Sequence, residues 1–516
     1  MMPAELKYTP ADEILQIHAE LDASFRAGKM RPVAYRKYAL AQLGYMLKDN
    51  TERIVEAMNI DLGKPAQETH FTELGPSIAE VADAYRNLDK WARPSRPPLH
   101  LIFTPLRRVV YKEGKGVCLI IAPFNFPILN AFSPVVSALA AGNTVVLKPS
   151  EQTPATATLL AELVPKYLEP SVLRIVNGSV AETSKLLDLK WGHIMFTGSG
   201  RVGRIVAGAG AKTLTPVTLE LGGKSPVFID PETCNVDTAA RRILFGKTSN
   251  SGQVCVAPDY IIVPRSYQDR FVEALKKAYD EFYPDGVHVP GVSMGRMVSS
   301  SAFQRVKGLL DATRGTYVAG GSRDESKLFI TPTIVRDCAW DDPLMSEEIF
   351  GPVLPIVPVD TLEEGIEHVN QGDRPLTIYG FTTDSALQRK LREEMSSGSI
   401  IFNDIMIQVG VEGLPFGGIG ESGSGYHNGK YGFDAFTHFR ASLDSRPWLD
   451  ILMRFRFPPY SATKIWVSSF LFASLPRRPS GPPDLSARSH WRRWLLFILA
   501  TLLSSVAIAR KKLGPS

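Results

Sequence analysis

From about residue 116 the sequence alternates short, unbroken apolar runs with helical stretches. The apolar runs include residues 116–121, 143–147, 193–196, 227–229 and 260–263. A run without polar alternation predicts a strand buried on both faces, and helices between such strands predict the crossovers of a parallel sheet. The runs fall into two series, and 516 residues exceed what one hydrophobic core usually holds. We therefore expect an α/β protein with two doubly wound, Rossmann-like domains in tandem.

The two ends of the chain differ from this body. Residues 11–60 carry apolar side chains at three- and four-residue spacing, which predicts helices. Residues 441–516 hold 12 Lys and Arg against 3 Asp and Glu, whereas the first 440 residues hold 46 against 50. A mildly acidic body argues against nucleic acid as a partner, and a basic tail favours an anionic lipid surface.

The tail contains an apolar segment with basic residues on both sides. Residues 494–509 carry no charge, and these 16 residues would span about 24 Å as a helix, against roughly 30 Å of bilayer hydrocarbon. Arg492, Arg493 and residues 510–512 stand where long basic side chains reach the headgroups. We expect a C-terminal membrane anchor over 491–512, and whether it spans fully stays open. A second apolar stretch, 465–475, is too short to span and is expected at an interface or over an entrance.

The cysteines do not indicate a disulfide framework or a metal site. Cys118, Cys234, Cys255 and Cys338 are few and scattered, and no Cys/His cluster accompanies them. This favours a reducing compartment, and the start of the chain lacks the apolar run of a signal peptide. A single cysteine is most often an inert core residue. Cys255 differs because turn-forming and polar residues, Asn250-Ser-Gly-Gln, precede it.

A glycine-rich turn stands at the end of a short strand in the first series. Phe196-Thr-Gly-Ser-Gly-Arg-Val-Gly203 matches the G-x-G-x-x-G pattern and opens a helix, so its backbone amides would face a pyrophosphate. The dinucleotide fingerprint expects an acidic residue about 20 positions further on, where Glu220 stands. On that interpretation Glu220 binds a ribose and Cys255 has no role. The glycine pattern alone does not decide the matter.

Six motifs in a fixed order do decide it. They are Ala122-Pro-Phe-Asn-Phe-Pro127, Lys148-Pro-Ser-Glu151, Phe196-Thr-Gly-Ser199, Leu219-Glu-Leu-Gly-Gly-Lys-Ser-Pro226, Glu347-Glu-Ile-Phe-Gly-Pro352 and Leu414-Pro-Phe-Gly-Gly418. With these motifs and the flanks of Cys255, the chain resembles the aldehyde dehydrogenase superfamily over roughly residues 15–440. The runs 214–226 and 256–260 look like the class-3 branch. Within that branch, the hydrophobic C-terminus resembles the membrane-anchored fatty aldehyde dehydrogenases.

The resemblance implies a catalytic set of three residues. Cys255 is the nucleophile whose sulfur forms a thiohemiacetal and then a thioester, and an ordinary thiol needs help from a base or a local field to ionise. Asn125, with the backbone amide of Cys255, donates hydrogen bonds to the oxyanion. Glu220 is the general base that activates water for hydrolysis of the thioester.

The resemblance also implies NAD as cofactor and no metal. Lys148 is expected to bind the adenosine ribose, and Glu151 beside it should repel the 2′-phosphate of NADP. NADP stays possible, because Arg201 is placed to oppose Glu151 and the branch accepts both cofactors. The remaining cofactor-binding candidates are Gly198, Ser199 and Gly203 near the pyrophosphate, and Glu348 with Phe350 at the nicotinamide ribose.

The expected domains follow the same resemblance. They are an NAD-binding domain over 10–222 with part of an oligomerisation arm near 98–116, a catalytic domain over 223–405, an oligomerisation or bridging segment over 406–440, a basic Pro/Arg-rich tail over 441–490 and the anchor over 491–512. The small β extension implies a homodimer. A C-terminal anchor without an N-terminal signal places the catalytic body in the cytosol. The endoplasmic reticulum, mitochondrial outer membrane, peroxisome and lipid droplet stay open as its membrane.

The tail also suggests the substrate class. Long apolar aldehydes partition into bilayers, so an anchored enzyme meets them at a raised local concentration. We expect a fatty aldehyde or an isoprenoid or apocarotenoid aldehyde. Two alternatives are a CoA-acylating aldehyde dehydrogenase and a catalytically idle membrane scaffold. Glu220 argues against the first, since thiolysis needs no water-activating carboxylate, and the intact Asn125, Glu220, Cys255 and Glu348 argue against the second.

Overall fold

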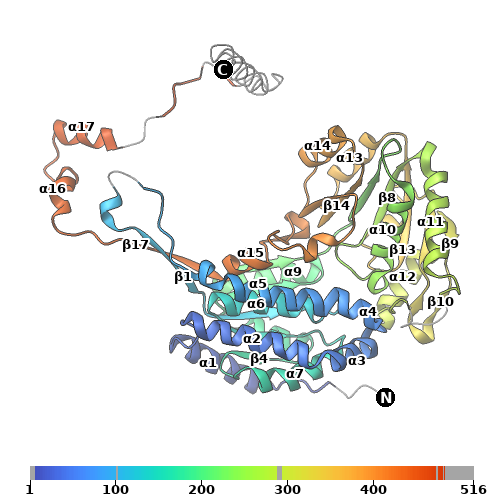
Figure 1. Cartoon of the computed structure of the whole chain (residues 1–516), viewed down its shortest axis with the longest axis horizontal. Helices are drawn as coiled ribbons and strands as arrows, with labels where there is room; N and C mark the ends of the chain where they lie inside the picture. Colours follow the sequence, from blue (N-terminus) through green and yellow to red (C-terminus); the bar gives the residue numbers. More distant parts are fainter. Residues whose placement is uncertain (1–5, 100–102, 288–292, 472–474, 480, 483–516) are drawn as a thin grey trace, which may run out of the picture. The chain divides into compact units, whose positions relative to one another are not determined.

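Two β-sheets formed by successive parts of the chain organise the fold (Figure 1). The computed structural model describes residues 6–99, 103–287, 293–471, 475–479 and 481–482. Within them, the first sheet has six strands in the order β16-β6-β5-β2-β3-β4. These are β2 (Val117–Ile121), β3 (Thr144–Lys148), β4 (Leu173–Ile175), β5 (His193–Thr197), β6 (Val217–Glu220) and β16 (Gly423–Ser424). β2 to β6 pair in parallel, and the edge strand β16 is antiparallel to β6.

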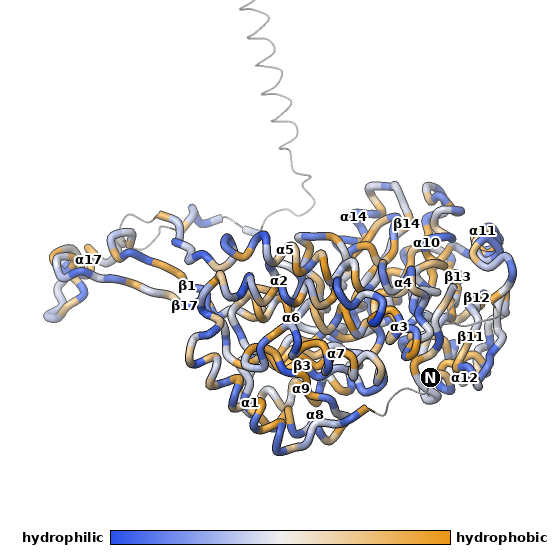
Figure 2. The backbone as a smooth tube through the Cα atoms, turned by 60° about the horizontal axis from the view of Figure 1, so that its bottom comes forward, coloured by the Kyte–Doolittle hydropathy of each residue, from blue (hydrophilic) through white to orange (hydrophobic). Residues whose placement is uncertain are grey.

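The apolar runs form the central strands because helices cover both faces of the sheet. Along β2, Cys118 and Ile120 enter one core, whereas Leu119 and Ile121 enter the other. One core is shared with α2 (Val33–Asp49), α3 (Thr51–Leu62), α5 (Gly75–Ala92), α6 (Leu129–Ala141) and α7 (Pro154–Tyr167), and the other with α1 (Ala11–Arg26), α8 (Val180–Leu187) and α9 (Gly200–Thr213). The covering helices mix apolar and polar residues along their length (Figure 2). Burial on both faces explains why the strands show no polar alternation.

The second sheet repeats this plan. Within the same described ranges it has seven strands in the order β15-β14-β7-β8-β13-β12-β9. The strands are β7 (Pro226–Ile229), β8 (Tyr260–Pro264), β9 (Thr316–Ala319), β12 (Thr333–Arg336), β13 (Val353–Val359), β14 (Thr377–Phe381) and β15 (Ser399–Phe402), and the helices around them are α10 (Val236–Thr248), α11 (Gln268–Phe282), α12 (Ser300–Ala312), α13 (Leu362–Gln371) and α14 (Ser385–Glu394). Neighbouring strands are parallel except β9, which is antiparallel to β12. The prediction of two Rossmann-like α/β units is therefore confirmed.

A two-stranded ribbon extends from this body. β1 (Val109–Gly114) pairs antiparallel with β17 (Thr437–Ser442), so segments more than 300 residues apart in sequence lie side by side. β1 falls within the arm expected near 98–116, and β17 follows the glycine-rich region. The use of this ribbon for dimerisation stays a prediction.

The chain divides into a large unit, Met1–Pro98 with Arg108–Ser442, and a small one, Leu99–Arg107 with Leu443–Ser516. The described part of the small unit contains two short helices, α16 (Leu449–Met453) and α17 (Ala462–Leu471). α17 includes most of the predicted 465–475 stretch and exposes Ile465 and Trp466. Among the residues with described positions, no helix has both the length and the apolar character needed to cross a bilayer. The predicted anchor over 491–512 lies outside the described residues.

Candidate active site

Cys255 follows a turn whose backbone is held in an uncommon conformation. After α10, the three consecutive residues Asn250, Ser251 and Gly252 have φ values of 49°, 54° and 70°. A residue other than glycine in this left-handed region costs of order 1–3 kcal/mol, so its surroundings must hold it there. A Cβ at Gly252 would lie 2.2 Å from the carbonyl oxygen of Gly351, and only glycine fits. The turn is therefore packed against the chain that precedes β13.

Gln253 fixes this turn from the inside. Its side chain is fully buried, and its Nε2 donates to the carbonyl oxygens of Asn250 and Arg296, both at 3.0 Å. Its Oε1 accepts from the backbone amide of Val298 at 2.9 Å. Every polar atom of the side-chain amide thus has a partner, which locks the residue two positions before Cys255.

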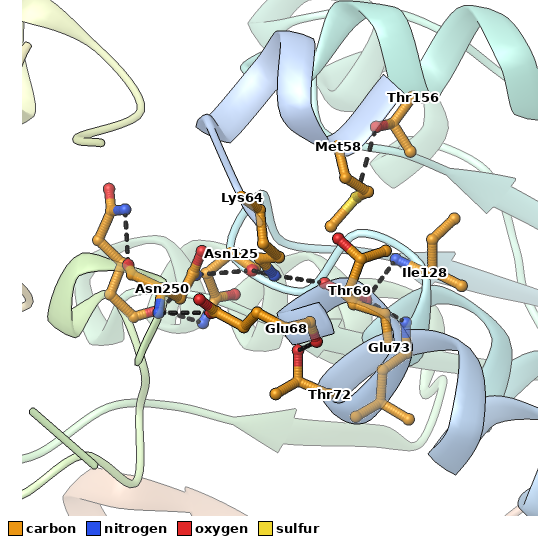
Figure 3. A network of polar contacts seen from close by, with 12 residues as sticks. Met58, Lys64, Glu68, Thr69, Thr72, Glu73, Asn125, Ile128, Thr156 and Asn250 are labelled. Carbon is orange, nitrogen blue, oxygen red and sulfur yellow. Dashed lines mark hydrogen bonds and ion pairs between the residues drawn. The ribbon is translucent and has the colours of Figure 1, made fainter. Parts of the chain in front are cut away.

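Asn125 meets the same turn from the first sheet. Its Nδ2 donates to the carbonyl oxygen of Gln253 at 3.0 Å, and its own carbonyl accepts from Asn250 Nδ2 at 2.8 Å. The two segments far apart in sequence are therefore joined by reciprocal hydrogen bonds, as Figure 3 shows for Asn125 and Asn250. An amide nitrogen carries two hydrogens, so Asn125 keeps one N–H for an oxyanion.

A buried ion pair contacts the segment that carries Asn125. Lys64 and Glu73 have no exposed side-chain surface, and Nζ lies 2.7 Å from Oε1. The other carboxylate oxygen accepts the backbone amides of Ile128 and Leu129, at 3.1 and 2.9 Å, where α6 begins (Figure 3). A carboxylate at a helix N-terminus is favourable because it meets unpaired amides and the positive end of the dipole. Lys64 Nζ also donates to the Asn125 carbonyl at 3.3 Å.

Glu220 stands at the end of β6 with a partner from the glycine-rich loop. His427 Nε2 lies 2.8 Å from Glu220 Oε2, and Thr197 Oγ1 donates to the same oxygen at 3.3 Å. Both members of the Glu220–His427 pair are almost completely buried. We did not expect His427 from the sequence. Its place next to the Leu414-Pro-Phe-Gly-Gly418 motif was the one available signal.

Cys255, Glu220 and His427 line one cavity of about 650 Å³. Its walls are mostly apolar, and the apolar residues along them include Phe71, Phe126, Leu129, Phe245, Val254, Ile405, Met406, Ile407, Val409, Val411 and Phe416. Phe71 is 70% exposed, so the apolar lining continues to the surface of the protein. A cavity of this size and lining can hold an apolar organic group beside the polar side chains of Cys255, Glu220 and His427.

The surroundings of Cys255 disfavour the thiolate. Burial raises the pKa of the Cys255 thiol well above its ordinary value, and the carboxyls of Glu220 and Glu348 add to the rise. The backbone amides of Cys255 and Val256 act in the opposite sense. These surroundings therefore favour the protonated thiol, and a nearby positive charge or proton acceptor would favour the thiolate.

The expected cofactor residues converge at the carboxyl edge of the first sheet. Lys148 ends β3, Thr197 ends β5, and β2 pairs with both strands. Lys148 is buried and its Nζ donates to Glu151 Oε2 at 2.7 Å, which makes a lysine–carboxylate pair suited to hydroxyl groups. Ser199 is the N-cap of α9 and makes no side-chain capping hydrogen bond. The first-turn amides of α9 thus have no side-chain cap, and they fit a pyrophosphate.

Gly198 and Gly203 serve this arrangement through packing. A Cβ at Gly198 would lie 2.6 Å from Cζ of Phe196, and one at Gly203 would lie 2.7 Å from Cδ2 of Leu221. The missing side chains let α9 begin close against the sheet, where its N-terminus meets the strand ends.

Glu348 and Phe350 approach from the second sheet. Glu348 Oε2 would lie 2.0 Å from a Cβ at Gly222, so the Glu348 carboxyl lies directly against the backbone where the chain leaves β6. Burial raises the pKa of Glu348 to about 8, and Asp259 adds to the rise. Phe350 has a φ of 44° and packs edge-on against Phe124 at 5.8 Å. Glu348 and Phe350 therefore contact the chain just after β6 and β2, at the same edge of the first sheet as the other cofactor candidates.

Comparison with known proteins agrees with this geometry. The pattern of the aldehyde dehydrogenase family matches residues 4–442. The chain is similar to a substrate-bound AldH of Staphylococcus aureus, with a TM-score of 0.86 at 36% identity over 89% of this chain and 99% of that one. It is also similar to a Mycobacterium tuberculosis aldehyde dehydrogenase complexed with NAD⁺, with a TM-score of 0.76 at 29% identity, covering 85% and 91% of the two chains. The chain belongs to the aldehyde dehydrogenase family and is an aldehyde dehydrogenase that uses NAD or NADP.

The relatives also identify the branch. Human aldehyde dehydrogenase family 3 member B1 is 41% identical over 445 residues, which are 86% of this chain and 94% of that protein. Family 3 member H1 of Arabidopsis thaliana is 40% identical over 456 residues, 88% and 93% of the two chains. The predicted membership of the class-3 branch is confirmed. The individual roles of Cys255, Glu220, Asn125 and the cofactor residues stay predictions.

The Lys64–Glu73 pair generates a stability prediction. Glu73→Gln removes the carboxylate that lies 2.7 Å from the buried Lys64 ammonium and leaves the more weakly interacting Glu68 as its neighbouring charge. Breaking a buried pair in this way costs about 3–5 kcal/mol. We expect a clear loss of free energy of unfolding in denaturant titration. The matched control is Glu162→Gln, which removes the carboxylate of the exposed Arg53–Glu162 pair. Equal effects of the two substitutions would contradict the role of the buried pair.

Proposed function

We propose that this enzyme oxidises long, apolar aldehydes to carboxylic acids with NAD as the electron acceptor, through a thioester on Cys255. The observation that carries the proposal is the shared cavity of about 650 Å³, in which Cys255 and Glu220 stand among mostly apolar walls. Fatty aldehydes and isoprenoid or apocarotenoid aldehydes both have the required length and apolarity.

In the first half of the reaction the Cys255 sulfur attacks the carbonyl carbon. The new C–S bond turns the carbonyl oxygen into an oxyanion, which accepts hydrogen bonds from Asn125 Nδ2 and the Cys255 amide. Donors held in place beforehand stabilise this charge strongly, and the hydrogen bond from Asn125 to Gln253 holds Nδ2 in its place. When bound at Glu348 and Phe350, the cofactor would supply a positive ring that favours release of the thiol proton to solvent, and an acceptor for the hydride. The C–H bond of the former aldehyde carbon breaks as the oxyanion re-forms the C=O bond, which leaves the acyl group on Cys255 as a thioester.

In the second half a water molecule hydrolyses the thioester. Glu220 removes a proton from this water, the water oxygen bonds to the carbonyl carbon, and the sulfur leaves with the electrons of the C–S bond. The carboxyl supports this role because it lines the cavity together with Cys255. His427 and Thr197 hold its Oε2, which leaves Oε1 for the water.

The cofactor assignment follows the strand ends. Lys148 and Glu151 bind the adenosine ribose, and Ser199 with the first turn of α9 binds the pyrophosphate, packed close by Gly198 and Gly203. Glu348 and Phe350 bind the second ribose. We propose that Glu151 gives a preference for NAD, since a 2′-phosphate would meet its carboxylate.

The proposed division of the chain keeps the expected bounds. It assigns 10–222 to NAD binding, 223–405 to catalysis, 406–440 to oligomerisation or bridging, and 441–490 to the basic tail. The β1–β17 ribbon supports a homodimer. The membrane anchor over 491–512 holds the catalytic body at a membrane on its cytosolic side and concentrates lipid-soluble substrate there.

Replacement of Glu220 tests the mechanism. Glu220→Gln should form the acyl-enzyme but hydrolyse it about 10²–10⁴-fold more slowly, because the amide cannot take a proton from water. Stopped-flow kinetics should show a burst near one NADH per site followed by slow turnover. Cys255→Ala should give no burst although it binds NAD, and Glu363→Gln, an exposed residue paired with Lys390, should match the wild type. Turnover of Glu220→Gln at the wild-type rate would remove this residue from the mechanism.

The product of the same reaction separates the alternatives. Free acid supports hydrolysis, whereas formation of an acyl-CoA in the presence of coenzyme A would indicate the acylating route. No NADH with any long aldehyde, despite NAD binding, would indicate an idle scaffold.

The cavity lining predicts a substrate ranking. Each added methylene buried in an apolar wall contributes about 0.8 kcal/mol, so kcat/KM should rise roughly fourfold per methylene until the cavity is filled. An aldehyde with a terminal carboxylate should lose this gain, because Glu80, Asp83 and Glu412 also line the cavity, and Arg242, which lines it too, is already paired with Asp404 at 3.4 Å. Assay of matched methyl-ended and carboxylate-ended series, beside a polyene aldehyde, checks this. Equal kcat/KM along the methyl-ended series would contradict the proposal.

The anchor is tested by membrane flotation. The full chain should float with membranes and resist carbonate extraction. The variant Ile498→Asp with Leu502→Asp should stay in the soluble fraction, since each aspartate near the centre of a spanning helix costs about 2.5–3.5 kcal/mol. Unchanged kcat with a short aldehyde would show that the catalytic body is intact. A soluble wild-type chain would contradict the anchor.

A further inference from the structure

The carboxylate of Glu220 is held asymmetrically. Among the described residues, the hydrogen bonds to this carboxyl converge on Oε2, from His427 Nε2 at 2.8 Å and Thr197 Oγ1 at 3.3 Å. Oε1 is then the oxygen left for a water molecule in the cavity. The side chains of His427 and Glu220 are only 5% and 3% exposed, so bulk water does little to stabilise charge on either.

His427 is itself fixed in orientation. Its backbone pairs with Phe416 through two hydrogen bonds of 3.1 and 2.8 Å, and the two rings meet edge to face at 5.3 Å. Nδ1 lies 3.4 Å from Ser133 Oγ on α6, and Ser133 Oγ donates to Asn428 Oδ1 at 3.1 Å. Because the Ser133 hydroxyl donates its hydrogen to Asn428, its oxygen can accept a hydrogen bond from His427 Nδ1. Both ring nitrogens therefore face acceptors, which suits an imidazolium with two N–H donors.

The charges that surround the ring have one sign. Glu220 on β6 contacts it directly, Glu80 on α5 faces it, and the contacts from α6 and from Phe416 are neutral. Burial lowers the pKa of His427, but Glu220 and then Glu80 outweigh it, so that the net pKa lies above the ordinary value. Asp83, one turn along α5, adds to the negative charge near Glu80.

We propose that His427 is the positioning residue of the hydrolytic step, a buried counter-charge that holds Oε2 of Glu220 and turns Oε1 toward the attacking water. This proposal rests on the proposed role of Glu220 as base. The water loses its proton to Glu220 Oε1, its oxygen bonds to the thioester carbon, and Cys255 leaves as the thiolate. His427 keeps its own protons throughout and supplies charge and orientation only. A buried carboxylate without such a partner is disfavoured, since burial penalises the charged form.

The test is the pH dependence of acyl-enzyme hydrolysis, measured in single turnover with the full chain and NAD. His427→Gln keeps a hydrogen-bond donor but removes the charge. An opposite charge at this distance favours the ionised carboxyl by about 1–3 pH units. Without that charge, the acid limb of the pH–rate profile for hydrolysis should therefore move to higher pH by the same amount. The hydrolysis rate at high pH should change less than tenfold, and the NADH burst should stay near one per site.

A matched control removes the other contact to the same oxygen. Thr197→Val deletes a neutral donor, so its acid limb should stay where the wild type has it, whatever its rate. A second variant, His427→Asn, has a shorter amide, and the same upward shift in it would show that loss of charge is the cause.

The outcomes separate this inference from the proposed function. The proposal that His427 acts as a counter-charge would be contradicted if the acid limb of His427→Gln coincided with that of the wild type. An equal loss of rate at every pH would contradict it as well. If Glu220→Gln also hydrolyses the acyl-enzyme normally, the proposed function fails first. If Glu220→Gln stalls while the limb of His427→Gln does not move, only the present inference fails.

Discussion

The reciprocal hydrogen bonds between Asn125 and the turn before Cys255 are the contact on which the site depends. They join the end of β2 in the first sheet to the chain that leads into β8 in the second. The conformation of the turn costs free energy, because Asn250 and Ser251 adopt left-handed backbone conformations. Gln253 and the Lys64–Glu73 pair offset this cost by giving buried polar groups their partners. Cys255 and Asn125, the proposed nucleophile and the proposed oxyanion donor, are thus positioned by one network.

The electrostatics of the cavity set a second constraint. A cavity with mostly apolar walls suits a hydrocarbon substrate, but it penalises charges that are buried within it without a partner. The pKa of the Cys255 thiol is raised by this burial, and that of Glu348 reaches about 8. A charged group in such a place needs a fixed partner. Glu220 has one in His427, and Lys148 has one in Glu151.

The strands were predictable from the sequence because burial on both faces removes polar residues from them. The run 116–121 became β2 within one residue, and the Phe196-Thr-Gly-Ser motif does lead from β5 into α9. The candidate site residues came instead from the family motifs, and in the structure several of them stand at strand ends, where side chains meet along the carboxyl edge of a parallel sheet.

The residues that support the site were not predictable in this way. Lys64 and Glu73 look like ordinary surface charges in the sequence, yet both are completely buried. Gln253 stood within a recognised motif, but its role depends on carbonyls contributed by Arg296 and on the amide of Val298. His427 reaches Glu220 across 207 positions. Each of these contacts exists only once two distant segments pack, and no local periodicity encodes such a meeting.

The close approach of Gly252 to the Gly351 carbonyl has a consequence for how this enzyme can change. It clamps the loop that carries the nucleophile to the loop that carries Glu348 and Phe350, with no room for even one methyl group between them. A shift in one loop must be followed by the other. Selection or engineering that changes the loop of Glu348 and Phe350, the proposed nicotinamide contacts, will therefore disturb Cys255 as well. Productive variants should carry paired, compensating changes on both sides of that contact.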